Sequence, residues 1–331
     1  MGIKTVKFGG SSLADAAQFR RVGEIVRADS ARRYVIASAP GKRTPDDIKV
    51  TDMLYRCYEM ARAREDITDY FAKIAERYNA IIRDLGLNYD IAGELAYICD
   101  GINHHTGRDF AASRGEYLSS LILAKYLKYD FIDAESVIFF QENGSFDAEK
   151  TREELRKELK KHERAVIPGF YGVMPNGTIR TFSRGGSDVT GSIVAEAAEA
   201  ELYENWTDVS GCLMADPRIV ENPRPIRTVT YRELRELSYM GASVLHEEAI
   251  FPVRAAGIPI NIRNTNDADA PGTMIVAGTS EYDAKTVITG IAGKKGFSVI
   301  SVEKDLMNSE IGFARKMLDV LEDNGISFEH L

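Results

Sequence analysis

Short apolar runs alternate with longer amphipathic segments along most of the chain. Apolar or alternating runs predict β-strands at 5–8, 34–39, 131–132, 137–140, 165–167, 178–182, 203–208 and 258–262. Apolar positions at helical spacing predict helices at 14–28, 51–63, 67–84, 116–126 and 190–201. Thr-x-x-Glu sequences that begin at Thr151 and Thr230 predict two more helices with capped starts. This alternation predicts an α/β fold with an open, mainly parallel sheet and helices on both faces.

The pattern changes after Gly278. Residues 289–302 carry two short strand patterns, residues 309–324 an amphipathic helical pattern that ends at Gly325, and residues 326–331 the start of another strand. The pattern stops at the start of its last strand, so it covers only about half of the α+β domain that it begins. We therefore expect a first domain at 1–278, a partial α+β domain at 286–331, and a chain that is a fragment of a longer protein.

Two glycine–serine turns stand where a predicted strand meets a predicted helix. One spans 9–12, directly after Lys7, and the other spans 184–188. Glycines allow close backbone approach to an anion, serine hydroxyls cap the following helix, and the helix N-terminus favours negative charge. Each turn alone is equally consistent with an ordinary strand-to-helix connection. Together they favour a phosphate site in one crevice at the carboxyl ends of the strands.

Composition and charge indicate which classes of binding partner to expect. Of 331 residues, 44% are hydrophobic and 28% charged, and the formal net charge is −8. Without a basic tract or an apolar run of about 20 residues, we expect neither nucleic acid nor membrane as a partner. A start that runs straight into a strand and three scattered cysteines fit the cytoplasm. The pair His104-His105 lacks further ligands at metal-site spacing, so we interpret it as a surface turn and expect no protein metal centre.

The absence of several known motifs excludes some classes of enzyme. The chain contains neither the GxxxxGK[ST] phosphate loop nor the protein-kinase motifs, and no GxSxG or HExxH sequence. The remaining candidates are the glycine turns, Lys7, Arg184 and two acids beside glycines, Glu116 and Asp188. They suit phosphoryl transfer, which needs positioned charge more than covalent help, but they do not name the acceptor.

The order of several motifs resembles that of the aspartate kinases of the amino-acid kinase superfamily. The segment Lys7-Phe8-Gly9-Gly10-Ser11-Ser12 is similar to their N-terminal signature. Further similar segments follow in order at 38–41 (SAPG), 114–116 (RGE), 168–170 (PGF), 183–188 (SRGGSD), 206–209 (WTDV), 216–218 (DPR), 241–246 (GASVLH) and 272–273 (GT). The tail from Ile288 resembles the first part of the family's regulatory ACT domains.

The resemblance implies an amino-acid kinase (carbamate kinase-like) fold and a reaction. ATP and L-aspartate would give ADP and 4-phospho-L-aspartate with Mg²⁺, the first step toward lysine, threonine and methionine. A side-chain carboxyl with a pKa near ~3.9 is already ionised at neutral pH, so the nucleophile needs no general base. The resemblance also implies allosteric control by an amino acid and a homo-oligomer that pairs through its ACT domains.

Site roles carry over by position. The resemblance implies catalytic roles for Lys7 and Asp188, with Asp188 orienting Lys7 or the metal shell. The residues implied on the substrate side are Thr51, Glu116 for the α-ammonium, Arg184 for the α-carboxylate, and Ser187. Those implied on the nucleotide side are Gly9, Gly10, Ser11, Thr207, Asp208 and Arg218. Those implied at an effector site are Met307, Gly312, Ser327 and Glu329.

Two positions depart from the family pattern and two rival functions stay open. Ser243 stands where many members have a lysine near the nucleotide, and Leu213 replaces a common tyrosine, so Arg218 is expected to carry more of the phosphate charge. We interpret Trp206 as a core residue. The rivals are a kinase for glutamate or N-acetylglutamate and a catalytically silent amino-acid sensor; intact Lys7 and Glu116 argue against the sensor.

Overall fold

The computed structural model describes residues 2–104, 106–183, 185–239, 245, 247–278, 288–293, 295–296 and 298–328. The chain divides into a first unit, residues 1–293, and a second unit, residues 294–331. The strands of the first unit are β1 (Lys4–Phe8), β2 (Arg32–Ala37), β3 (Asp130–Phe131), β4 (Ala165–Pro168), β5 (Tyr171–Val173), β6 (Ile179–Thr181), β7 (Leu202–Thr207), β8 (Thr228–Thr230), β9 (Ile260–Asn264) and β10 (Thr273–Val276). Its α-helices are α1 (Ala16–Arg27), α2 (Val50–Arg62), α3 (Thr68–Asp84), α4 (Ala92–Asn103), α5 (Arg108–Leu127), α6 (Ala148–Leu159), α7 (Gly186–Ala197), α8 (Tyr231–Tyr239) and α9 (Glu247–Ala255).

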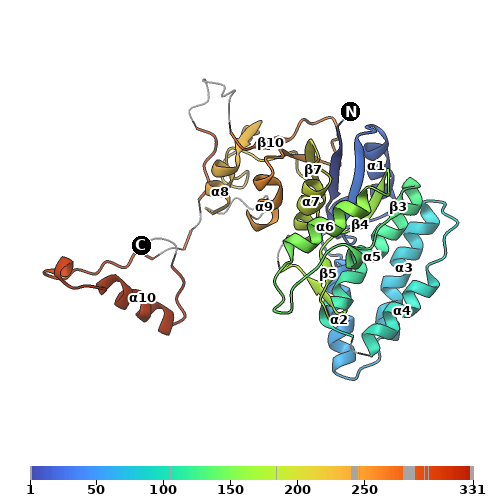
Figure 1. The fold of residues 1–331 in the computed structure, drawn as a ribbon, viewed down its shortest axis with the longest axis horizontal. Coiled ribbons are helices and arrows are strands. Elements are labelled where there is room, and N and C mark those ends of the chain that lie inside the picture. Colours follow the sequence, from blue (N-terminus) through green and yellow to red (C-terminus); the bar gives the residue numbers. More distant parts are fainter. Residues whose placement is uncertain are drawn as a thin grey trace. The chain divides into compact units, whose positions relative to one another are not determined.

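An eight-stranded sheet organises the first unit (Figure 1), and β5 and β6 form a separate antiparallel pair. The eight strands of the sheet lie in the order β3-β4-β2-β1-β7-β9-β10-β8. Neighbours from β3 to β9 pair in parallel, and β10 runs antiparallel to β9. This confirms the predicted open, mainly parallel sheet. The chain leaves β1 toward β2 on one side and returns as β7 on the other, so the carboxyl ends of these three strands enclose a crevice of the kind that binds ligands.

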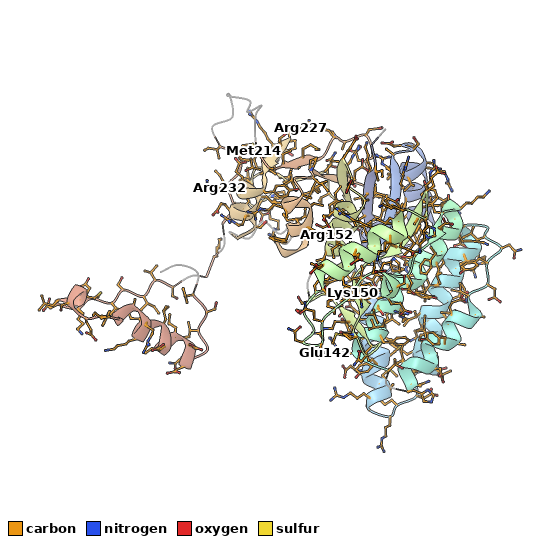
Figure 2. The ribbon with its side chains drawn as sticks, in the orientation of Figure 1. Glu142, Lys150, Arg152, Met214, Arg227 and Arg232 are labelled. Atoms are coloured by element: carbon orange, nitrogen blue, oxygen red, sulfur yellow. The ribbon has the colours of Figure 1, made fainter. Side chains whose placement is uncertain are left out.

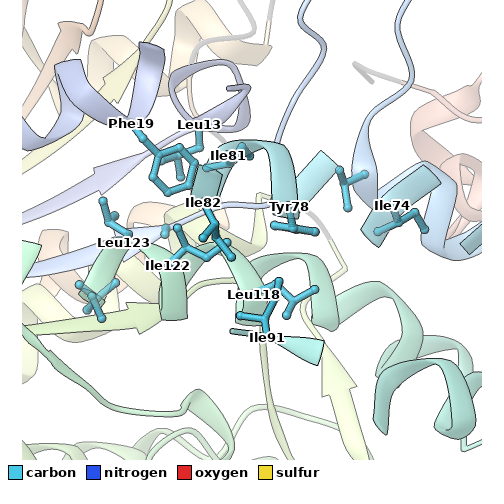
Figure 3. Close-up of a cluster of buried hydrophobic side chains, with 14 of the residues drawn as sticks. Leu13, Phe19, Ile74, Tyr78, Ile81, Ile82, Ile91, Leu118, Ile122 and Leu123 are labelled. Carbon is cyan, nitrogen blue, oxygen red and sulfur yellow. The ribbon is translucent and has the colours of Figure 1, made fainter. Parts of the chain in front are cut away.

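Helices cover both faces of this sheet, as the alternation of strands and helices predicts. In β2, Val35 and Ala37 pack into a cluster with α1 to α5, whereas Tyr34 and Ile36 pack into a second cluster with α6 and α7. Figure 3 shows the first cluster, where Phe19 of α1 lies near side chains of α3 and α5. Each fully buried large apolar side chain contributes roughly 1.5–3 kcal/mol, so the two clusters stabilise the sheet from both faces.

The predicted capped start of α8 is confirmed. The Thr230 N–H donates to Glu233 Oε2 (2.9 Å), and the Glu233 N–H donates to Thr230 Oγ1 (3.2 Å). This reciprocal pair satisfies two N–H groups at the start of the helix.

The predicted serine cap of α1 is wrong. The residues after β1 form a short 3-10 turn (Gly10–Leu13), and Asp15 caps α1 instead by accepting from the Gln18 N–H (3.0 Å). Ser12 Oγ lies 2.7 Å from Thr265 Oγ1, beyond the carboxyl end of β9. The hydroxyl is therefore used in a tertiary contact that no local pattern reveals.

The predicted cap at Thr151 is also wrong. Helix α6 begins earlier, and Asp147 caps it by accepting from the Lys150 N–H (3.1 Å). Thr151 Oγ1, inside the helix, accepts from the Phe139 N–H (2.9 Å). The expected strand at 137–140 is reduced to isolated bridges at Phe139 and Phe140, since the side-chain hydroxyl takes a backbone donor that a strand would use.

The second unit contains the predicted helix but not the predicted strands. Helix α10 (Phe313–Asp323) follows a 3-10 turn (Met307–Ser309), and Gly325 behind it has a positive φ of 64°. The expected strands at 289–302 and 326–331 are wrong for the described residues, none of which lies in a strand. A lone strand leaves its N–H and C=O groups unpaired, so a strand pattern without a partner does not form one.

Candidate functional site

Two cavities open at the carboxyl edge of the sheet. The larger has a volume of about 650 Å³ and is lined by Lys7, Asp188, Asn205, residues 207–209, 211–213 and 215–218, Leu237, Leu245, Ile262 and residues 291–293. The smaller has about 490 Å³ and is lined by residues 9–11 and 38–42, Lys49, Thr51, Glu116, Thr207 and Asp208. Thr207 and Asp208 line both cavities, so the two meet beyond β7.

A charge pair lies on the side of the larger cavity. Lys7 Nζ, on β1, lies 2.6 Å from Asp188 Oδ1, in the first turn of α7. Asn205 of β7 completes the group: its amide nitrogen donates to Asp188 Oδ1 (2.9 Å), and its amide oxygen accepts from Lys7 Nζ (3.4 Å). The structure thus brings together the two predicted glycine turns through the side chains that flank them. Asp188 does not cap α7, because Gly185 occupies that position with no side-chain cap.

The first glycine turn owes its composition to close backbone packing. A Cβ on Gly10 would lie 2.9 Å from the Ala39 carbonyl oxygen and 3.2 Å from Gly41 N, and one on Gly41 would lie 2.6 Å from the carbonyl carbon of Gly10. The Gly41 N–H donates to the Gly10 carbonyl (2.7 Å). The ends of β1 and β2 therefore touch backbone to backbone, and side chains at these positions would push them apart. At Gly9 a Cβ would meet only ordinary contacts, at 3.6 Å or more.

Glu116 is a buried acid in the smaller cavity. Its residue is 6% exposed, and no hydrogen bond from the described part of the chain reaches Oε2. Burial raises the pKa of Glu116 to about 8, because the charged form is stripped of water. Thr51, at the start of α2, lines the same cavity. The cavity therefore offers one carboxyl oxygen, Oε2, to a cationic ligand.

The loop 42–49 brings Lys42 and Lys49 to the smaller cavity. A side chain of α3, Arg77, holds this loop in place. Arg77 donates to the Ile48 carbonyl (2.9 Å) and the Gly41 carbonyl, and lies 3.4 Å from Asp47. The pKa of Asp47 is held well below its usual value, chiefly by its hydrogen bond from Arg43. Neither lysine was singled out by sequence reasoning, because nothing in a polar loop shows which side chains turn toward a cavity.

Two of the residues predicted to face a nucleotide, Asp208 and Arg218, line the larger cavity. Thr207 Oγ1 donates to Asp208 Oδ1 (3.1 Å), and Arg218 pairs with Asp216 (2.7 Å) in an exposed turn. Trp206, one position earlier, is 1% exposed, which confirms that it is a core residue.

Some predicted site residues are not brought together. Ser187 lines neither cavity and packs against Gly169, where a Cβ would lie 2.5 Å from the serine Oγ. Arg184 and Ser243 lie outside the described residues. Leu213, the other departure from the family pattern, lines the larger cavity.

The predicted effector residues belong to the second unit. Met307 lies in the 3-10 turn, Gly312 precedes α10 with a φ of 80°, and Ser327 is exposed; Glu329 lies outside the described residues. None of these positions lines either of the two cavities described above.

Asn205 was missed by sequence reasoning, although a signal for it exists. Strands of parallel sheets are usually continuous apolar runs because both faces are buried. The β7 sequence LYENWT breaks that rule in the middle of a sheet. A polar residue at such a position indicates a partner that the tertiary structure supplies.

Comparison with known proteins gives consistent matches over the whole chain. A model of the amino acid kinase family matches residues 3–264. The chain is 40% identical to aspartokinase 3 of Bacillus subtilis over 343 aligned positions, covering 99% of the chain and 75% of that protein. It is 29% identical to chloroplastic aspartokinase 1 of Arabidopsis thaliana, of which it spans 60%.

Solved structures give matches in the same family. The crystal structure of Clostridium acetobutylicum aspartate kinase superposes with a TM-score of 0.94 at 54% identity, covering all of this chain and 75% of that one. Escherichia coli aspartokinase III in complex with aspartate and ADP gives a TM-score of 0.73 at 27% identity, covering 84% of this chain and 65% of that one. Among the described helices, none has the length and apolar character needed to cross a bilayer.

Proposed function

Because the chain belongs to the amino acid kinase family, and within it to the aspartokinases, we propose that it transfers the γ-phosphoryl group of ATP to the side-chain carboxylate of L-aspartate. The products are ADP and 4-phospho-L-aspartate, so the enzyme is a phosphotransferase with a carboxyl acceptor. The observation that carries the proposal is the Lys7–Asp188 pair in the larger of two cavities that meet at Asp208. Two anionic substrates placed in these cavities approach each other beside a buried ammonium group.

The smaller cavity suits the amino acid. Glu116 Oε2, which lacks a partner among the described residues, accepts from the α-ammonium group. Thr51 offers a hydroxyl in the same cavity, and Arg184 and Ser187 are assigned to the substrate by the family resemblance alone. With the acceptor carboxylate already ionised at neutral pH, the residues of the site orient it and reduce its repulsion from the nucleotide rather than remove a proton.

The larger cavity suits the nucleotide. Its volume of about 650 Å³ lies within the usual range for small-molecule sites. Lys7 neutralises charge on the phosphoryl group, and Thr207, Asp208 and Arg218 face the nucleotide. Gly9, Gly10 and Ser11 line the smaller cavity, so they border the phosphates from that side, where the two cavities meet. With Leu213 in place of the family's tyrosine, Arg218 contributes more of the positive charge.

The residues present also fit Mg²⁺. This ion is usually held by one or two carboxylates together with substrate phosphates. Asp188 and Asp208 both line the larger cavity, and no described residue bonds Asp188 Oδ2. No cluster of three or more His, Cys, Asp or Glu residues is found in the described part, so the phosphates themselves would complete the shell. Bound there, the ion would neutralise phosphate charge.

For the tail we propose a regulatory role. Residues 286–331 form part of an ACT domain that follows a catalytic domain at 1–278. The proposal is supported by the apolar side chains that the second unit exposes, among them Val299 (92%), Leu306 (77%) and Ile311 (100%). In an assembled ACT pair these would be covered, and Met307, Gly312, Ser327 and Glu329 would border an effector site. Lysine or threonine is the expected inhibitor of a protein with complete ACT domains, and the chain of residues 1–331 is expected to be largely insensitive.

One assay tests the proposed activity against its rivals. ADP release is measured with MgATP and with L-aspartate, L-glutamate or N-acetyl-L-glutamate offered separately. We expect turnover with L-aspartate, and hydroxylamine trapping of the acyl phosphate confirms the carboxyl acceptor. Turnover with another acceptor alone assigns a different amino-acid kinase, and nucleotide binding without turnover on any acceptor assigns a silent sensor.

A further inference from the structure

Asn205 occupies a position where a polar side chain is costly. It lies in the middle of β7, between β1 and β9, and is 3% exposed. Its register partner on β9 is Ile262, and its partner on β1 is Lys7. A buried amide without hydrogen bonds would destabilise the fold by about 1–3 kcal/mol relative to an apolar residue. The presence of Asn205 therefore depends on what its amide group bonds.

Both ends of that amide point to the charge pair. Its nitrogen donates to Asp188 Oδ1 (2.9 Å), the same oxygen that lies 2.6 Å from Lys7 Nζ. Its oxygen accepts from Lys7 Nζ at 3.4 Å. Only one orientation of the amide gives a donor to the carboxylate and an acceptor to the ammonium. Two donors thus converge on Oδ1, and Oδ2 receives no hydrogen bond from any described residue.

A second residue of β7 holds the same turn of α7. Tyr203, two positions before Asn205 and hence on the same face of the strand, donates its hydroxyl hydrogen to the Asp188 carbonyl (3.3 Å). A Cβ on Gly191, one turn farther along α7, would lie 2.3 Å from that hydroxyl oxygen. The tyrosine fixes the backbone of the turn, so the rotation of the Asp188 side chain is left to Asn205 and Lys7.

We propose that Asn205 is a positioning residue of the phosphoryl-transfer site, which fixes Asp188 so that Oδ2 stays available to the nucleotide and its cation while Lys7 Nζ stays directed at the phosphates. This inference rests on the proposed function. It adds a neutral third member to the Lys7–Asp188 pair. Asn205 borders the larger cavity, and in this proposal its effect on the nucleotide passes through the two charged side chains that it bonds.

Two substitutions remove this action in different ways. Asn205→Leu keeps the size of the side chain and removes both hydrogen bonds. Asn205→Asp keeps the shape but places a second carboxylate against Asp188 Oδ1 and adds negative charge beside the phosphates. Since a hydrogen bond to a charged group contributes about 1.5–3 kcal/mol, each variant is expected to weaken MgADP binding by roughly 10- to 100-fold. The KM for ATP rises and kcat falls, whereas the KM for L-aspartate changes by less than about threefold.

A matched control separates this effect from simple loss of a buried amide. Asn261 of β9 is also a buried strand asparagine (9% exposed) but lines neither cavity. Asn261→Leu is expected to leave the dissociation constant of MgADP, measured by titration calorimetry, within about twofold of the unaltered protein. Calorimetry of MgADP needs no turnover, so this experiment stands even if the acceptor proposed above is wrong.

The decisive experiment exchanges the two side chains. Asn205→Asp with Asp188→Asn again places one carboxylate and one amide beside Lys7. We expect MgADP binding at least about tenfold tighter than in Asn205→Asp alone, since coupled residues are not additive. Asn205→Leu and Asn205→Asp proteins that melt and bind MgADP like the unaltered chain would overturn the proposal. The proposal would also be overturned if the exchanged variant lost as much MgADP binding free energy as its two single substitutions lose in sum. Should Asn205→Leu fail to fold, the isosteric Asn205→Asp and the exchange carry the test.

Discussion

The proton of Glu116 gives the most direct test of the proposed amino-acid site. The pKa of Glu116 is raised to about 8 by burial, so most molecules carry this proton at pH 7. An α-ammonium group that pairs with the carboxylate stabilises its charged form and lowers its pKa. Binding of L-aspartate at pH 7 should therefore release a proton from this residue.

Calorimetry measures that release. L-Aspartate is titrated into the protein with MgADP present, in several buffers that differ in ionisation enthalpy, and the dependence of the binding enthalpy on the buffer gives the number of protons. Glu116→Gln should lose this release and bind L-aspartate roughly 10- to 100-fold more weakly, the effect of losing one charge-assisted hydrogen bond. Glu142→Gln, an exposed position outside both cavities (Figure 2), is the matched control and should behave like the unaltered chain.

The same residue makes stability depend on pH in a definite direction. Because the pKa is higher in the folded protein than in the unfolded chain, the contribution of Glu116 to stability is full below about pH 4.5 and is lost as the pH rises through 8. The loss is on the order of 5 kcal/mol. Glu116→Gln should thus gain stability relative to the unaltered protein between pH 5 and pH 9. Equal proton release and equal pH dependence of unfolding in the two proteins would refute this account of Glu116.

Three further predictions follow from single contacts. Lys7→Ala should lower kcat by about 10²–10³ while far-ultraviolet circular dichroism stays unchanged, because a preorganised charge is lost; a folded variant with a third of the original kcat would contradict the role of Lys7. Gly10→Ala should cost about 1–3 kcal/mol in urea unfolding, because its Cβ would lie 2.9 Å from the Ala39 carbonyl oxygen; an unchanged midpoint would show that the turn yields without cost. The hydrogen bond to Asp130 raises the pKa of His162, so His162→Gln should lower the melting temperature at pH 5.5 and progressively less toward pH 8.5; a difference that grows with pH would exclude this ion pair.

Local patterns in the sequence are enough to predict the fold class and much of the order of strands and helices. Strands such as β1, β4 and β9, and helices such as α3, carry their periodicity in consecutive residues, so local patterns locate them within a few positions. The capping box at Thr230 and Glu233 is equally local, and it forms as predicted. The glycine turns and the order of the short motifs were sufficient to indicate the family.

Predictions failed where a side chain finds its partner far away in the chain. Ser12 was expected to cap α1 but lies against Thr265, which is 253 positions away, and Thr151 was expected to cap α6 but bonds the backbone of Phe139. Capping rules consider only hydrogen-bond partners within a few residues of a polar side chain. They cannot include partners that folding brings close from elsewhere in the chain.

The construction of the site depends on contacts between segments that lie far apart in the sequence. Lys7 and Asn205 are 198 positions apart, and they meet because β7 returns to the sheet beside β1. The pKa of Glu116 depends on the packing of α5 against the end of β2, where a Cβ on Gly115 would lie 2.7 Å from the Ala39 Cβ. The sequence gives the residue types of the site. The distances between their side chains, and the exclusion of water from them, arise only when the strand order places those residues at one edge of the sheet.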